Sequence, residues 1–141
     1  MRRCDLQRMI SHFRGKPEVS ALYVFGARSG PAPGKREACL GVLVDGSLLG
    51  GRHYESVLEE CVPVLDPDVR DVLVMNLADP FVKFHIIRKG SVVFEKNPGH
   101  RVRFTAAAVR EFYNSYSLAR DEGAEEGLEQ AYEVECVELD C

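Results

Sequence analysis

The feature that most constrains this chain is a pair of apolar runs on either side of a loop rich in glycine and proline. The runs cover residues 19–25 and 38–45, and the loop covers residues 26–34. Short apolar runs bounded by Gly and Pro are typical of buried β-strands. Glycine lets the backbone approach a ligand closely, and Arg28 and Lys35 add positive charge beside it. The stretch therefore predicts two buried strands and a candidate phosphate-binding site at the loop between them.

Helical periodicity and turn signals divide the rest of the chain into alternating helices and strands. Apolar residues at i, i+3, i+4 and i+7 predict the helices, and Asp79-Pro80 is a typical N-cap and first residue of one of them. The expected helices cover residues 5–13, 54–65, 79–88 and a long segment from residue 98 to 117–121, and further strands cover residues 71–75 and 91–95. This order predicts a mixed α/β (α+β) domain with one small mixed β-sheet packed against helices.

Three finer expectations follow from local patterns. Residues 71–75 are too apolar for a half-exposed strand, which predicts a place inside the sheet. His85 is expected on the polar side of its helix, because neighbouring phenylalanines form the apolar side. The apolar stripe predicted for the long last helix consists of Val102, Ala106, Val109, Phe112, Tyr113 and Tyr116.

Size, charge and hydropathy limit which classes of protein this chain can belong to. The 141 residues suffice for one domain, expected at residues 1–120, followed by an acidic tail at residues 121–141. The tail carries nine acids and no Lys or Arg, whereas residues 1–120 hold all 18 Lys and Arg against 13 of the 22 acids, a net charge of +5. Such a tail can stay disordered or dock as a terminal element. No apolar run reaches the roughly 20 residues of a membrane span and no signal-peptide pattern is present, so we expect a cytoplasmic protein.

The order of the segments resembles the minimal nucleotidyltransferase family of the DNA polymerase beta-like superfamily. Family members carry a strand, a Gly-Ser turn with a glycine-containing loop, and then Asp-x-Asp on the next strand. The first motif corresponds here to Gly26, Ala27, Arg28 and Gly30, with Ala27 where the family has Ser. The resemblance covers residues 5–120 and implies that these four residues bind nucleotide.

The carboxylate positions of the resemblance are only partly acidic in this chain. Glu37 and Cys39 stand where the family has Asp-x-Asp, and Asp71 stands where a later strand supplies the third carboxylate. The resemblance implies that Glu37 and Asp71 are the catalytic and metal-binding residues, with Mg²⁺ and ATP as cofactors in an active protein. Family members commonly pair with a helical HEPN-type toxin, and some transfer AMP to it.

Nucleotidyl transfer places strict demands on these positions. Two Mg²⁺ ions clamp the attacking and leaving oxygens, and Mg²⁺ requires hard oxygen ligands. Side chains two residues apart on a strand lie on the same face, so Glu37 and Cys39 are expected to share one face of the strand, as the two Asp of the family motif do. Cys39 is a soft ligand, however, and on an apolar strand it is expected to be a small buried hydrophobe. Glu37 and Asp71 either bind metal or form charge pairs with basic neighbours.

These observations favour one function and leave two alternatives. The favoured interpretation is a catalytically degenerate, antitoxin-like binding subunit with a HEPN-type protein partner. The first alternative is an active Mg²⁺-dependent nucleotidyltransferase that transfers AMP from ATP to a partner protein. The second is nucleic-acid binding, which lacks a reading motif and depends on a cationic region that the acidic tail could cover instead. That region comprises Lys83, Arg88, Lys89, Lys96, His100, Arg101, Arg103 and Arg110.

Overall fold

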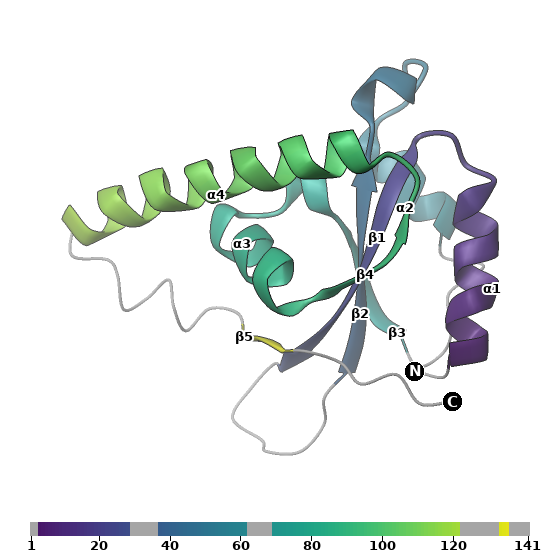
Figure 1. The fold of residues 1–141 in the computed structure, drawn as a ribbon, viewed down its shortest axis with the longest axis horizontal. Coiled ribbons are helices and arrows are strands. Elements are labelled where there is room, and N and C mark those ends of the chain that lie inside the picture. Colours follow the sequence, from purple (N-terminus) through teal and green to yellow (C-terminus); the bar gives the residue numbers. More distant parts are fainter. Residues whose placement is uncertain (1–2, 29–36, 62–68, 122–132, 136–141) are drawn as a thin grey trace.

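The computed structural model describes residues 3–28, 37–61, 69–121 and 133–135 of the chain (Figure 1). The helices are α1 (Arg3–Arg14), α2 (Tyr54–Cys61), α3 (Pro80–Lys89) and α4 (Pro98–Asp121), with short 3₁₀ turns η1 (Gly46–Leu48) and η3 (Met75–Leu77). The strands are β1 (Val19–Arg28), β2 (Glu37–Val44), β3 (Val69–Val74), β4 (Ser91–Glu95) and β5 (Glu133–Glu135). The expected mixed α+β domain with one small sheet is confirmed.

The strands form one mixed sheet in the order β3-β2-β1-β4. β1 runs antiparallel to both β2 and β4, whereas β2 and β3 are parallel. β5 pairs with the far end of β1, beyond the stretch that pairs with β4. β1 is therefore the central strand, and its two halves have different neighbours on one side.

Helices cover both faces of the sheet, which explains the apolar character of the two central strands. α1 and α2 pack on one face and α3 and α4 on the other (Figure 1). In β1, Leu22 and Val24 enter the core under α1 and α2, while Tyr23 and Phe25 enter the core under α3. A strand buried on both faces requires a nearly continuous apolar run. None of the described helices is long and apolar enough to cross a lipid bilayer.

Several sequence-based expectations are confirmed at the residue level. Asp79 caps α3, because its Oδ1 accepts a hydrogen bond of 2.9 Å from the Phe81 amide, and Pro80 follows as the first helical residue. Val57 and Cys61 are buried on the expected face of α2. This helix was predicted to continue to residue 65, and residues 62–65 lie outside the described part of the chain.

The expectation that β3 lies inside the sheet is wrong. Among the described strands, β3 pairs only with β2 and occupies an edge of the sheet. Val72 and Leu73 are half-buried and Val74 is buried, because α2, α3 and η3 pack around this edge. Helices that cover an edge strand give it the apolar composition of an interior strand, so composition alone misplaced β3.

The buried stripe predicted for α4 is also wrong in part. Val102 and Tyr113 are 57% and 59% exposed, and Ala106 is exposed as well. Phe104 and Ala108, which lie on a neighbouring face, pack inward, and of the predicted stripe Phe112 packs against Phe84 of α3. Apolar residues surround much of this helix, so the period alone does not fix its rotation. Figure 1 shows that α4 extends beyond α3, which leaves its last turns without the sheet beneath them.

The expected orientation of His85 is wrong as well. Its ring packs edge-on against Phe84 at a centroid distance of 5.8 Å and against Phe112 at 6.3 Å. Phe112 of α4 packs over this side of α3. The sequence pattern of α3 alone could not predict this contact, because α4 is a separate helix.

Candidate functional site

The proposed nucleotide-binding segment begins as strand rather than as loop. β1 continues through Gly26, Ala27 and Arg28, three residues past the expected end of the strand. On one side, Ala27 pairs with Glu37 of β2, and on the other side it pairs with Val134 of β5. In an antiparallel ladder, successive residues direct their N–H and C=O groups to alternate neighbours. A strand on either side therefore occupies the backbone of this segment, while Gly30 lies outside the described residues.

Three neighbouring strands bring the expected carboxylate positions together. Cys39 of β2 pairs with Phe25 of β1 and with Asp71 of β3, so the three residues form one row across the sheet. Glu37 is two residues before Cys39 in the same strand, at its first residue, and the side chain of Glu37 lies outside the described part of the structure. The backbone thus places Glu37, Cys39 and Asp71 at neighbouring positions of the sheet.

Cys39 is a buried apolar residue in this row. It is 1% exposed and belongs to the core between the sheet and α3, together with Tyr23, Phe25 and Ile86. A cysteine in an apolar core behaves as a small hydrophobe, and sulfur is a poor ligand for Mg²⁺. The described side chains at this position offer Mg²⁺ one carboxylate, that of Asp71, and a buried thiol. The described side chains alone therefore supply only one of the several hard oxygen ligands that a pair of Mg²⁺ ions needs.

Asp71 is exposed and lies at the rim of a cavity of about 360 Å³ along the β3 edge. Its Oδ1 accepts a hydrogen bond of 2.9 Å from the amide of Val72, so one carboxylate oxygen already has a partner in the chain. The cavity is walled mainly by apolar side chains, among them Leu58 and Leu77, and Asp79 is its second acid. An apolar cavity with carboxylates at its rim suits an apolar group that carries a positive charge, and it disfavours a bare polyphosphate.

No protein-family model, curated protein or solved structure matches this chain. The family resemblance therefore stays a hypothesis that depends on the order and spacing of the segments.

At least four of the eight residues of the cationic region make hydrogen bonds or ion pairs within the chain. Lys83 is buried and bonded to Glu111 at 3.3 Å, and its ammonium group lies over the ring of Phe104. Arg101 pairs with Glu95 at 2.8 Å. Lys96 and His100 also make hydrogen bonds within the chain, to the carbonyl of Lys16 and to the hydroxyl of Ser20. A phosphate backbone would have to compete with these contacts.

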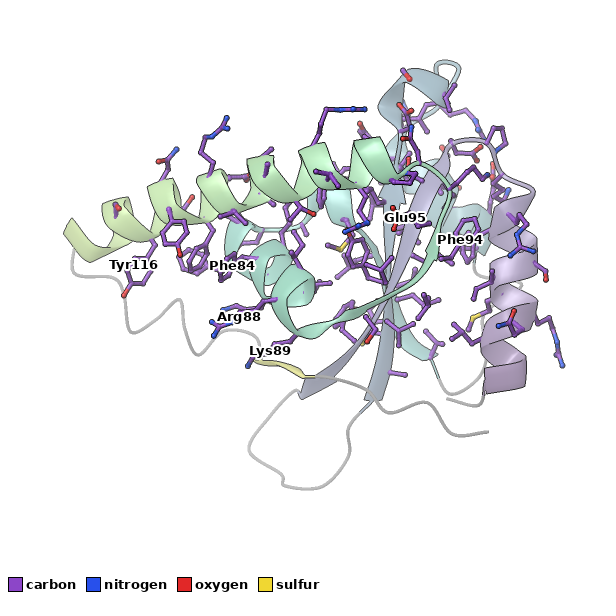
Figure 2. The ribbon with its side chains drawn as sticks, in the orientation of Figure 1. Phe84, Arg88, Lys89, Phe94, Glu95 and Tyr116 are labelled. Atoms are coloured by element: carbon purple, nitrogen blue, oxygen red, sulfur yellow. The ribbon has the colours of Figure 1, made fainter. Side chains whose placement is uncertain are left out.

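Sequence reasoning missed an aromatic cluster where α3 meets α4. Phe84 and Phe112 stack with their ring centroids 3.9 Å apart, and Tyr116 stacks on Phe112 at 5.9 Å. Figure 2 shows Phe84 and Tyr116 together near the protruding end of α4. The edge of the cluster is open, because Tyr113 is 59% exposed. The signal in the sequence was the recurrence of aromatic residues on both helices, but the crossing of the helices decides that they meet.

The second buried thiol, that of Cys61, is a structural group. Its Sγ donates a hydrogen bond of 2.9 Å to the carbonyl of Val57, one turn earlier in α2, and it is fully buried. Burial raises the pKa of the Cys61 thiol from its ordinary value of 9.0 to about 12. A thiol that is neutral and covered at neutral pH is a poor nucleophile.

Cys61 should therefore resist alkylation in the folded protein. At pH 8 with iodoacetamide, we expect the native protein to leave Cys61 unmodified over times that fully modify it in urea, because the native thiol stays neutral until the pH approaches 12. Peptide mass spectrometry after quenching measures the extent at this residue. Rapid modification of native Cys61 at pH 8 would contradict its burial.

Proposed function

We propose that this chain is a nucleotidyltransferase-fold protein that acts as a catalytically degenerate, antitoxin-like binding subunit. Its proposed partner is a helical protein of the HEPN type, as the family resemblance implies. The burial of Cys39 is the main observation in support of lost catalysis. Cys39 lies beside Asp71, at a position where nucleotidyl transfer requires a metal-binding carboxylate. Loss of a group that acts mainly on the transition state typically costs about 10²–10³ in rate.

The backbone at the end of β1 supports the same proposal. Phosphate binding by a Gly-Ser turn uses backbone N–H groups that point out of the structure toward the ligand. Here Gly26, Ala27 and Arg28 pair with strands on both sides, and Ala27 lacks the hydroxyl of the family's Ser. Neither the backbone pairing nor the side-chain chemistry of this segment favours transfer of a nucleotide.

Two surfaces support a role in protein binding. The aromatic cluster of α3 and α4 exposes Tyr113, and aromatic residues are enriched at protein interfaces. The cavity beside Asp71 accepts an apolar side chain next to a basic one. Both surfaces are able to bind a partner without metal or nucleotide.

A transfer assay tests the proposal. The protein is incubated with ATP labelled at the α-phosphate, with Mg²⁺ and with candidate HEPN-type proteins. We expect the partner to bind equally well with and without Mg²⁺, and we expect neither protein to become labelled, since the proposed binding uses no metal. Robust label transfer that Asp71→Ala abolishes would establish the active enzyme instead.

A second test restores the family's residues and measures the binding of ATP. Ala27→Ser/Glu37→Asp/Cys39→Asp restores the acids and the hydroxyl that the family carries, so it should acquire Mg²⁺-dependent binding of ATP, measured by calorimetry. Wild-type protein should show no dependence on Mg²⁺ in the same titration. Equal, metal-dependent binding by both proteins would show that Cys39 is no obstacle to a nucleotide site.

A further inference from the structure

β5 and β4 share one side of β1, but they are connected to the chain very differently. β4 pairs with residues 21–24 of β1 and is continuous with α3 and α4. β5 pairs with Gly26, Ala27 and Arg28 through only three residues, which come from the acidic tail. Without β5, the backbone of these three residues would present an open strand edge, which is a template for another extended chain.

Charge complements the pairing at this edge. Residues 121–141 carry nine acids and no Lys or Arg, and β5 itself reads Glu-Val-Glu. α3 contacts β5, and the last turn of α3 carries Arg88 and Lys89. Figure 2 shows both side chains at the end of α3 on the side where β5 lies.

We propose that the edge of β1 at Gly26–Arg28 is a docking site for an extended acidic segment, and that the chain's own tail fills it reversibly through β5. A three-residue strand contributes few hydrogen bonds, each of about 0.5–1.5 kcal/mol net. Its attachment to the same chain gives it an effective concentration of the order of millimolar, which holds it in place and makes it a competitor for the edge. The tail thus closes the very backbone that a phosphate or a partner strand would have to reach.

This proposal concerns the same stretch as the proposed nucleotide-binding segment, but it depends on strand pairing and charge and not on nucleotide binding. The result of the transfer assay therefore does not bear on the docking site. The results of the two tests below do not bear on catalysis.

The first test opens the edge in the full-length protein. Val134→Pro/Glu135→Pro removes backbone donors from β5 and should detach it, so the amides at residues 26–28 that are directed to β5 should exchange at least about tenfold faster. Amides of the same stretch that are directed to β2 should keep their exchange rates. Residues 21–24, which pair with β4, should exchange as in the wild type. The matched control, Gly127→Pro/Leu128→Pro, places the same two prolines in the tail outside β5 and should leave the exchange unchanged. Unaltered exchange at residues 26–28 in Val134→Pro/Glu135→Pro would overturn the proposal.

The second test supplies the segment as a separate molecule. A fluorescent peptide of residues 129–139 with Cys136→Ser should bind the opened variant at least about tenfold more tightly than the wild type, whose own tail competes. The same peptide with Glu133→Gln and Glu135→Gln should bind several-fold more weakly, and added salt should reduce this difference. Fluorescence anisotropy measures both affinities.

Three outcomes of the peptide test would overturn the proposal. Absence of binding to the opened variant would mean that the edge is no docking site for a separate chain. Equal binding to the wild type and the opened variant would mean that β5 does not occupy the edge in solution. A concentration-dependent dimer of the wild type that the two prolines abolish would mean that β5 comes from a second copy of the chain.

Discussion

Replacing Leu22 by alanine should lower the free energy of unfolding by about 2–5 kcal/mol, the usual cost of a large cavity in a core. Leu22 lies in the middle of β1, is 0% exposed, and packs in the core that α1 and α2 share with the sheet. Val42 of β2 and Phe94 of β4 are its cross-strand neighbours, so the loss affects three strands at once. Urea denaturation at neutral pH measures the change.

Leu48→Ala is the matched control for Leu22→Ala. Leu48 has the same side chain but is 50% exposed in η1, so its truncation should change stability by less than about 0.5 kcal/mol. Similar losses in the two variants would mean that β1 is not the centre of the core.

Cys39→Asp should destabilise the protein by about 3–5 kcal/mol at neutral pH in the absence of metal, because it places an unpaired carboxylate in an apolar core. Position 39 is 1% exposed and pairs with Asp71, whose own charge opposes a second carboxylate. Cys39→Ala, which leaves only a small cavity, should cost about 1 kcal/mol and serves as the control. Thermal unfolding of the two variants distinguishes buried charge from lost packing.

The pH dependence of Cys39→Asp follows from the same burial. Burial raises the folded-state pKa of the new carboxyl group above its unfolded value of about 3.9. Below that value the group is protonated in both states and the charge penalty is absent. The penalty appears as the pH rises from the unfolded to the folded pKa, so the difference from Cys39→Ala should shrink on acidification. A difference that is constant from pH 3 to pH 8 would show that position 39 is open to water.

The effect of Mg²⁺ on the stability of Cys39→Asp is a further test. Cys39→Asp gives adjacent strands two carboxylates in one row, so millimolar Mg²⁺ should restore part of the lost stability, whereas the wild type should not respond. Equal responses of the two proteins would contradict the view that position 39 is a lost metal-ligand position.

The sequence predicted those elements whose signal is local. The α3 cap depends on Asp79 and Pro80, which act within one turn, and both were placed correctly. The strands were recognised because apolar runs bounded by turn residues have few alternatives in a small domain. Cys39 was correctly expected to be a buried hydrophobe, since a strand apolar on both faces leaves no polar side for it.

The expectations that failed depended on contacts between distant segments. The position of β3 at the sheet edge, the rotation of α4 and the aromatic surroundings of His85 are all set by which elements pack together. A hydrophobic period shows that a face is apolar, but it does not show which neighbour covers that face. The end of β1 illustrates the same limit, because glycines that predict a loop are also compatible with a strand once β2 and β5 pair with them.

The sequence alone determined that this is one small α+β domain with an acidic tail, and that an Ala, a Glu and a Cys occupy the positions of a Ser and two Asp in the family it resembles. These properties depend on composition and short-range pattern. The tertiary structure decided that Cys39 and Asp71 are neighbours and that Cys39 is buried. It also decided that the tail pairs with the end of β1. Strand register and docking are set by contacts between segments far apart in the chain, and no local pattern specifies them.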